Sequence, residues 1–183
     1  ANMCPDWRHF DVVCDGQFYC HLDMGVLGKH NALNALAAAG AAWMMGIPGE
    51  AVSKGLESFH GAGRRMEYKG EFNGADVYDG YAHHPDEVVA TIASIRASMP
   101  EKRLVLAFQP HTYTRTKALF DDFVRELAKA DVLVLAEIYA ARERNTVGIS
   151  SRDLAVQIPN SIYCETLPDV TAYLKEHVRS GDV

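Results

Sequence analysis

The sequence contains little cysteine, no excess of basic residues and no long apolar run. Its four cysteines (Cys4, Cys14, Cys20 and Cys164) form no C-x-x-C pair and no metal-ligand spacing, so neither a disulfide framework nor a zinc site is expected. Eighteen lysines and arginines against 24 aspartates and glutamates give a net charge of −6, which argues against a nucleic-acid surface. No apolar stretch approaches the roughly 20 residues of a membrane span, and no signal-peptide pattern follows Ala1. These absences predict a cytoplasmic globular protein with no nucleic-acid or membrane partner.

A phosphate-binding loop is also missing, because the spacing G-x-x-x-x-G-K-[ST] occurs nowhere in the chain. The last residues, Ser180-Gly181-Asp182-Val183, have the pattern of a turn that enters another strand. We therefore expect the chain to be part of a larger protein and to lack a final strand after Val183.

The first third of the chain predicts a β-hairpin followed by two helices. Apolar residues alternate over 10–22 around Asp15-Gly16, a strong hairpin dipeptide. Asn31 is the expected N-cap of an alanine-rich helix over 32–45. A second helix is expected over about 48–59, because proline is favoured where a helix begins.

The segment Gly61-Ala62-Gly63 is the best candidate for a linker, and the pattern changes after it. Strands and helices then alternate, which predicts an α/β fold with a parallel sheet, right-handed crossovers and flanking helices. The expected strands cover residues 75–78, 103–108, 131–138 and 161–163, and the expected helices begin at Pro85, run over 117–129, begin at Ser150 or Ser151, and run over 168–177.

Polar side chains gather in the loops that follow the first three of these strands, residues 79–84, 109–116 and 138–148. In parallel sheets, ligands bind outside the carboxyl ends of the strands. Because these loops hold an unusual share of the histidine, tyrosine, arginine and threonine of the chain, they predict a ligand site.

The first loop contains Tyr81-Ala82-His83-His84-Pro85 at the start of a helix. Adjacent histidines in that position can bind an anion, orient a carboxylate or ligate a metal. A metal site is disfavoured, because no acidic residue stands at a zinc-ligand spacing and H-E-x-x-H is absent. Spacing alone also allows a structural role, in which His84 packs and bonds within the loop while His83 faces solvent.

The second loop, Gln109 to Thr116, supplies a guanidinium, several hydroxyl groups and an imidazole. Arginine captures a carboxylate or phosphate with two parallel hydrogen bonds, and a helix N-terminus favours anions. The alternative is that Thr114 or Thr116 caps the helix and Arg115 is solvated. Since two polar clusters follow adjacent strands, we favour a small anionic ligand.

A third cluster, Gly28-Lys29-His30-Asn31 with Asn34, precedes the linker. Asparagine offers a paired donor and acceptor that match an adenine edge. The alternative is that Asn31 is a cap and Asn34 a partly exposed polar residue. Arg64-Arg65 could reach a phosphate, although spacing alone favours a solvated hinge.

Taken together, these segments resemble the Mur ligase family. Residues 28–38 resemble the pattern G-K-H-N-x-x-N-A-L-A-A, and residues 64–67 resemble R-R-F-E. Residues 79–85 resemble D-D-Y-A-H-H-P, and residues 108–116 resemble F-Q-P-H-x-Y-[ST]-R-T. The resemblance covers nearly the whole chain, and the H-H-P and F-Q-P-H elements are its most specific parts.

The resemblance implies an ATP-dependent ligase that uses ATP and Mg²⁺ and adds L-alanine to UDP-N-acetylmuramate through an acyl phosphate, in peptidoglycan precursor synthesis. Residues 1–62 would be the tail of a central ATP-binding α/β domain, and residues 63–183 a Rossmann-like C-terminal domain. The phosphate-binding loop and most magnesium ligands would lie before Ala1, so the chain alone is expected to be inactive.

The resemblance also implies roles for individual residues. His83 and Arg115 would position the substrate, and the chain would hold no metal ligand and no catalytic residue. The residues implied for ATP are Asn31, Asn34, Arg65 and Asp79, and those implied for the amino acid are Tyr81, His83, His111 and Arg115.

Two positions depart from the family pattern. Gly80 stands where an aspartate expected to hold the ATP ribose is usual, and Asp79 is a candidate to replace it. Thr112 stands where many members carry arginine, which leaves Arg115 as the expected carboxylate anchor.

Three other interpretations remain open on the sequence. A ligase that recycles murein tripeptide has similar motifs, and Tyr81 favours the alanine ligase over it. A metal-dependent hydrolase would use His83, His84 and His111. A non-catalytic module that binds a nucleotide or an amino acid is the third.

Overall fold

The computed structural model describes residues 7–26, 28–61 and 63–183. Cys4 and the middle residue of the expected linker, Ala62, lie outside the described residues. Contacts divide the chain into two compact units. Unit 1 comprises the residues up to Glu67 together with Ala93–Pro100, and unit 2 comprises Tyr68–Ile92 and Glu101–Val183. Within the described residues, no helix combines the length and apolarity needed to cross a membrane.

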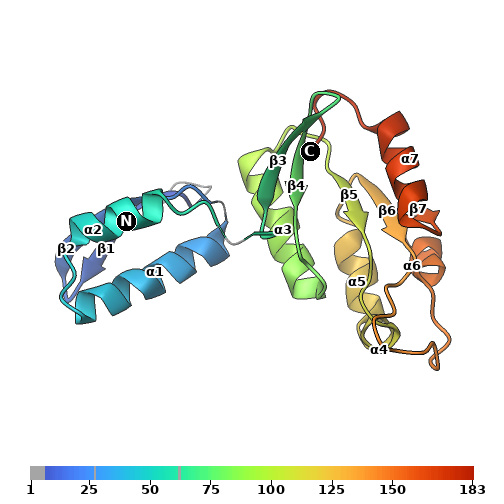
Figure 1. Cartoon of the computed structure of the whole chain (residues 1–183), viewed down its shortest axis with the longest axis horizontal. Coiled ribbons are helices and arrows are strands. Elements are labelled where there is room, and N and C mark those ends of the chain that lie inside the picture. The colour runs from blue at the N-terminus through green and yellow to red at the C-terminus, as the bar shows by residue number, and fades with distance from the viewer. Residues whose placement is uncertain (1–6, 27, 62) are drawn as a thin grey trace. The chain divides into compact units, whose positions relative to one another are not determined.

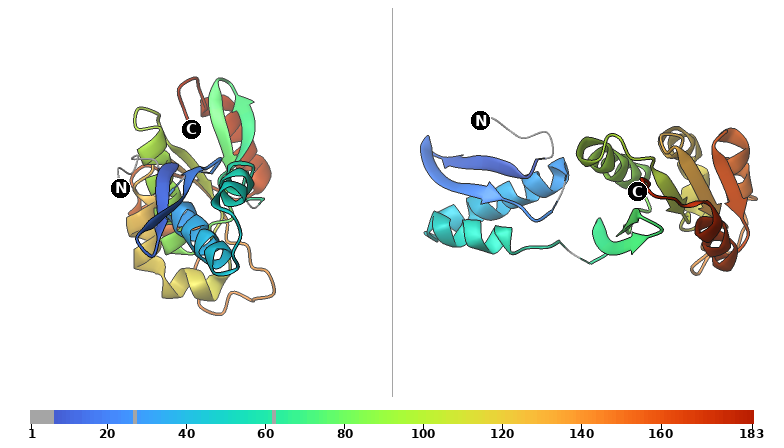
Figure 2. Two further views of the ribbon diagram at one scale, coloured as in Figure 1. Left: turned by 90° about the vertical axis from the view of Figure 1, so that its left-hand side faces the viewer. Right: turned by 90° about the horizontal axis from the view of Figure 1, so that it is seen from above.

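Unit 1 contains the expected hairpin, formed by β1 (His9–Cys14) and β2 (Gln17–Asp23), which pair antiparallel (Figure 1). Asp15 and Gly16 both have positive φ, 51° and 77°, as the favoured two-residue hairpin turn requires. Two helices cover one face of this hairpin (Figure 2). Their shared core contains Phe10, Val12, Cys20, Leu22, Ala32, Ala35, Ala39 and Val52.

The first helix, α1 (Lys29–Met44), begins earlier than the sequence predicted. Its N-cap is Gly28, with φ 95°, and the Asn31 N–H already donates to the Gly28 carbonyl (3.0 Å) inside the first turn. The expectation that Asn31 is the N-cap was therefore wrong. Glycine reaches positive φ without steric cost, so the chain can turn into the helix at Gly28.

The second helix, α2 (Gly49–Glu57), follows Pro48 as expected and ends two residues before Phe59. Its start lies tightly against β2, because a Cβ added at Gly49 would collide with the carbonyl group of Tyr19. The Tyr19 hydroxyl donates to the Ile47 carbonyl (2.7 Å), and the Ser53 hydroxyl donates to the His21 carbonyl (2.6 Å). Close backbone approach therefore fixes this helix on the hairpin.

A second two-stranded sheet is formed by β3 (Glu67–Phe72) and β4 (Ala75–Asp79). The sequence predicted β4 but not β3, and it placed β4 in the parallel sheet, which was wrong. The turn Asn73-Gly74, with φ 52° and 75°, is a typical hairpin dipeptide that could have revealed β3. The main chain of Asp182 lies between β4 and the residues before β5. Its carbonyl accepts from the Asp76 N–H (3.2 Å), and Asp182 also forms a parallel bridge with Arg103.

The remaining strands form a three-stranded parallel sheet in the order β5 (Val105–Phe108), β6 (Val132–Ala136), β7 (Ser161–Cys164) (Figure 1). All three strands were predicted. On the central strand, Val134 and Ala136 pack with Val170 of a flanking helix, and the alternate residues Leu133 and Leu135 are fully buried. Burial of both faces is typical of parallel sheets. The chain therefore has the expected α/β fold with helices flanking a parallel sheet.

The helices that follow β4 confirm three predictions and correct one. Helix α3 (Pro85–Ser98) begins at Pro85, α6 (Ser151–Gln157) is capped by Ser150, and α7 (Leu167–His177) ends where expected. The helix expected over 117–129 is instead two helices, α4 (Tyr113–Ala118) and α5 (Phe120–Leu127). They separate at Leu119, whose φ of −111° and ψ of 24° are not helical.

The approach of α2 to β2 can be tested with Gly49→Ala. The new methyl group would force the helix away from the Tyr19 carbonyl, and we expect a loss of about 1–3 kcal/mol in the free energy of unfolding of unit 1. Both tryptophans, Trp7 and Trp43, belong to this unit, so denaturation followed by tryptophan fluorescence reports on it.

The matched control is Gly55→Ala in the same helix, where an added Cβ meets no atom within 4 Å. Alanine is the better helix former, so this variant should gain up to about 1 kcal/mol. Equal stabilities of the two variants would contradict the close approach at Gly49.

Candidate functional site

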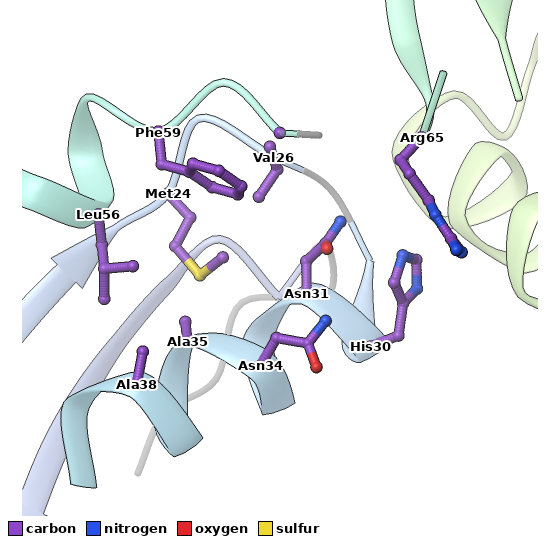
Figure 3. Close-up of a pocket in the computed structure, with 11 residues that line it drawn as sticks. Met24, Val26, His30, Asn31, Asn34, Ala35, Ala38, Leu56, Phe59 and Arg65 are labelled. Carbon is purple, nitrogen blue, oxygen red and sulfur yellow. The ribbon is translucent and has the colours of Figure 1, made fainter. Parts of the chain in front are cut away.

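Unit 1 contains a cavity of about 590 Å³ beside the N-terminal half of α1 (Figure 3). Asn31 and Asn34 stand three positions apart on α1, so their carboxamides lie on one face of the helix. Arg65 adds a guanidinium to the same lining. Three of the four residues expected to bind ATP thus line one cavity. Its apolar lining consists of Met24, Val26, Ala35, Ala38, Leu56 and Phe59.

His30 also lines this cavity, although the sequence analysis gave it no role. Burial lowers the pKa of His30, and the positive charge of Arg65 lowers it further. The imidazole is therefore neutral at neutral pH, which leaves Arg65 as the cationic group of the lining. A neutral imidazole can accept a hydrogen bond on one nitrogen and donate one from the other.

Asp79, the fourth residue expected at ATP, is the last residue of β4 and belongs to unit 2. It is not among the residues that line the cavity. The next residue, Gly80, has open space around it, because an added Cβ would meet no atom within 4 Å. A side chain at position 80 would therefore fit without displacing its neighbours.

A second polar site lies in unit 2 at the carboxyl ends of β4, β5 and β6. Four rings form a continuous series there: Tyr81 to His83 (5.4 Å between centroids), His83 to His111 (6.2 Å) and His111 to Tyr139 (5.5 Å). The structure thus brings together three residues expected at the amino acid. Tyr139 was missed, although it lies in the polar loop after β6.

The two adjacent histidines have different environments. His83 Nδ1 lies 3.0 Å from the Tyr81 carbonyl oxygen and 3.3 Å from a carboxylate oxygen of Glu87, so His83 is held among the rings. His84 Nδ1 accepts from the Asp86 N–H (3.3 Å) within its own turn. His84 therefore has the structural role considered for it, and His83, whose side chain is 36% exposed, contacts Tyr81 and Glu87 as well as solvent.

The loops after β5 and β6 are joined by main-chain hydrogen bonds. The Tyr139 N–H donates to the Pro110 carbonyl (2.8 Å), and the Thr112 N–H donates to the Tyr139 carbonyl (2.9 Å). Thr112 is the N-cap of α4, with φ 68°, ψ 141° and no capping bond from its side chain. The alternative that Thr114 or Thr116 is the cap was wrong, and Thr116 instead donates its hydroxyl to the Thr112 carbonyl (2.7 Å). A β-branched residue at positive φ is strained, so these bonds hold an unfavourable conformation.

Glu143, from the loop after β6, contacts the start of α4. Its two carboxylate oxygens accept from the Thr114 N–H (2.9 Å) and the Thr114 hydroxyl (2.5 Å). These hydrogen bonds lower the pKa of Glu143, so the carboxylate is ionised at neutral pH.

Farther along the same loop, Asn145 closes the exposed segment 144–148 by bonding to both the carbonyl (2.8 Å) and the N–H (3.2 Å) of Ile149.

Two buried nitrogens at this site have no hydrogen-bond partner among the described residues: His111 Nδ1 and Arg115 Nη1. Leaving a buried polar atom unsatisfied costs about 1–3 kcal/mol, and more when the group is charged. Arg115 is therefore not simply solvated, which was the alternative considered for it. An anion that accepts from Arg115, next to a partner for His111, would satisfy both atoms.

Cys14, Cys20 and Cys164 are free thiols, and burial raises the pKa of Cys20 and of Cys164. In the part of the chain that the structure describes, no group of three or more His, Cys, Asp or Glu side chains is arranged to hold a metal ion.

A family model described as "Mur ligase, glutamate ligase domain" matches residues 64–183, which include all of the second site. The chain belongs to the Mur ligase family. It is 43% identical over 178 residues to the UDP-N-acetylmuramate–L-alanine ligase of Lachnospira eligens, a match that covers 95% of the chain and 39% of the relative. It is 48% identical over 149 residues to the enzyme of the same name from Acidithiobacillus ferrooxidans, which covers 81% of the chain and 32% of the relative.

Solved structures agree with this family. The UDP-N-acetylmuramate–alanine ligase of Thermotoga maritima matches with a TM-score of 0.76 and 26% identity, over 92% of this chain and 36% of that one. A murein peptide ligase from Psychrobacter arcticus matches in fold, with a TM-score of 0.65 and 23% identity, over 97% of this chain and 38% of that one. The chain thus spans 32–39% of the length of these relatives.

The depressed pKa of His30 makes the stability of unit 1 dependent on pH. Below the ordinary histidine pKa of about 6.5, the unfolded chain binds a proton that the folded chain resists. The contribution of His30 to the free energy of unfolding should therefore be greatest above pH ~6.5 and should fall as the pH drops below that value. Urea denaturation at several pH values, followed by tryptophan fluorescence, measures this dependence.

His30→Gln should weaken the loss between pH 6.5 and 5, because it removes the group that resists protonation. His60→Gln, at an exposed histidine of the same unit, is the matched control for removing an imidazole. Identical pH dependence in wild type and His30→Gln would rule out the proposed state of His30.

Proposed function

We propose that the chain is the C-terminal part of a cytoplasmic ATP-dependent ligase that joins L-alanine to UDP-N-acetylmuramate in peptidoglycan precursor synthesis. Two considerations support the proposal: membership of the Mur ligase family, and relatives of that name at 43% and 48% identity. In this proposal, residues 1–62 end the central ATP-binding domain and residues 63–183 form the C-terminal domain. The family match that begins at residue 64 supports this boundary.

The observation that carries the proposal is the pair of unsatisfied nitrogens on His111 and Arg115. A guanidinium binds the carboxylate of an amino acid with charge-assisted hydrogen bonds. An imidazole nitrogen can accept from the ammonium group of the same molecule. The rings of His83 and Tyr139 contact that of His111, and Tyr81 contacts His83, so aromatic side chains are available beside His111 for a short apolar side chain such as that of alanine.

The cavity of unit 1 fits the nucleotide part of the proposal. Asn31 and Asn34 present donors and acceptors for an adenine edge, apolar side chains line the rest, and Arg65 offers a charge for phosphate. We assign Asp79 to the ribose. ATP, when bound, supplies the phosphoryl group that activates the muramate carboxylate, and the ligands for Mg²⁺ are expected mainly upstream of Ala1.

The test is phosphate release from ATP in the presence of UDP-N-acetylmuramate and L-alanine, with the chain compared with its parent protein extended upstream of Ala1. We expect alanine-dependent release from the extended protein and none from the chain alone. Release that depends on murein tripeptide instead would overturn the choice of alanine and indicate the recycling ligase. Binding of ATP or alanine without release by the extended protein would indicate a non-catalytic module.

Within the extended protein, Arg115→Ala should raise KM for L-alanine at least about tenfold, because the substrate carboxylate loses its charged partner. Lys117→Ala, at an exposed cation on the same helix, is the control for loss of positive charge. Equal KM values for alanine in these two variants would remove Arg115 from the amino-acid site.

Gly80→Asp tests the nucleotide site by a substitution that is expected to strengthen binding of ATP. Space for a side chain at position 80 means that the variant should fold normally, and a second carboxylate next to Asp79 offers another acceptor for the ribose hydroxyls. We expect KM for ATP to fall by a fewfold, with KM for alanine unchanged. A rise in KM for ATP would contradict the assignment of this turn to the ribose.

A further inference from the structure

The start of α4 is stabilised by a residue from another loop. The N-cap, Thr112, makes no capping bond with its side chain, and Glu143 accepts from both the main chain and the hydroxyl of Thr114 instead. Thr114 directly precedes Arg115, the residue with the unsatisfied guanidinium nitrogen. The segment that carries Arg115 is therefore fixed by a carboxylate 29 residues away.

Glu143 is itself held in place. Its N–H donates to the Ala140 carbonyl (2.9 Å), and the neighbouring Tyr139 is bonded on both sides to the loop after β5. Glu143 thus reaches α4 from a loop that is already bonded to the same strand end.

Both carboxylate oxygens of Glu143 accept a hydrogen bond from Thr114, which orients the carboxylate on the start of α4. The positive charge of Arg115 contributes to the lowered pKa of Glu143, so the two groups lie near each other. They form no direct ion pair among the described residues. A carboxylate that paired directly with the guanidinium would compete with any anionic ligand. The two hydrogen bonds from Thr114 direct Glu143 to the main chain and hydroxyl of that residue, and the guanidinium of Arg115 keeps an unbonded nitrogen.

We propose that Glu143 is a positioning residue that, through Thr114, holds Arg115 in place and leaves its guanidinium open to the carboxylate of the amino-acid substrate. This inference rests on the proposed function, because it concerns the same site. It assigns two residues, Glu143 and Thr114, to which the sequence analysis gave no role in substrate binding.

The proposal predicts an unusual order among variants. Thr114→Val removes the hydroxyl and frees one oxygen of Glu143, which can then turn toward Arg115 and compete with the substrate. Glu143→Ala loosens the start of α4 but leaves no competitor. The double variant should therefore resemble Glu143→Ala alone, because valine has no effect once the carboxylate is gone.

The experiment measures KM and kcat for L-alanine in the extended protein. We expect Thr114→Val to raise KM about tenfold or more, and Glu143→Ala to raise it about threefold to tenfold, with kcat within about twofold in both. Thr114→Ser should restore the low KM that valine loses. Glu165→Ala, at an exposed carboxylate after β7, is the matched control. Independent, additive effects of the Thr114→Val and Glu143→Ala substitutions, or unchanged KM values, would overturn the proposal.

A second measurement does not depend on activity. The heteronuclear NOE of the Arg115 Nε–H in the 183-residue chain reports whether the side chain is ordered on the fast timescale. It should be high in wild type and Thr114→Ser and reduced in Glu143→Ala, while the rest of the spectrum keeps its folded dispersion. Arg115 that stays equally ordered without Glu143 would overturn the positioning role. If the wild-type extended protein does not use alanine, the proposed function fails, and this measurement still decides the role of Glu143.

Discussion

Glu137 joins the carboxyl ends of the three parallel strands through its carboxylate and its main-chain carbonyl. It follows β6 and accepts from the hydroxyls of Tyr163 on β7 (2.7 Å) and Ser150 at the start of α6 (2.7 Å), and from the Ser151 N–H (3.1 Å). Its main-chain carbonyl accepts from Gln109 at the end of β5 (2.9 Å). Burial alone would raise the pKa of Glu137, but these hydrogen bonds outweigh it and lower the pKa, so the group is charged. Without this carboxylate, Tyr163 of β7 and the start of α6 would lose the partner that joins them to the end of β6.

The second site depends on that arrangement, because its residues come from three separate loops. A ring after β4, one after β5 and one after β6 lie in contact only when the strand ends keep their spacing. The strained backbone of Thr112 persists for the same reason, since its N–H is bonded to the loop after the next strand. The fold thus supplies the precision that a single polar loop would lack.

The sequence predicted the features that depend on local chemistry. The hairpin turn at Asp15-Gly16 and the cap at Ser150 follow from residue types in short windows, and all three parallel strands follow from short apolar runs. The loops that carry Tyr81, His111 and Arg115 could be selected because topology places them at one edge. The features that were missed depend on distant partners. Glu143 acts on a residue 29 positions away, and its role has no signature in the letters around it.

The hydrogen bonds between Asn145 and Ile149 divide the long loop after β6 into two parts with different freedom. Up to Glu143, the loop is bonded to the loop after β5 through Tyr139 and to α4 through Glu143. Beyond it, residues 144–148 form an exposed arch whose ends are already tied together. Loop entropy grows slowly with length, so added residues in such an arch cost little stability. The arch is accordingly the place where related chains can differ in length while Glu143 and Arg115 keep their geometry.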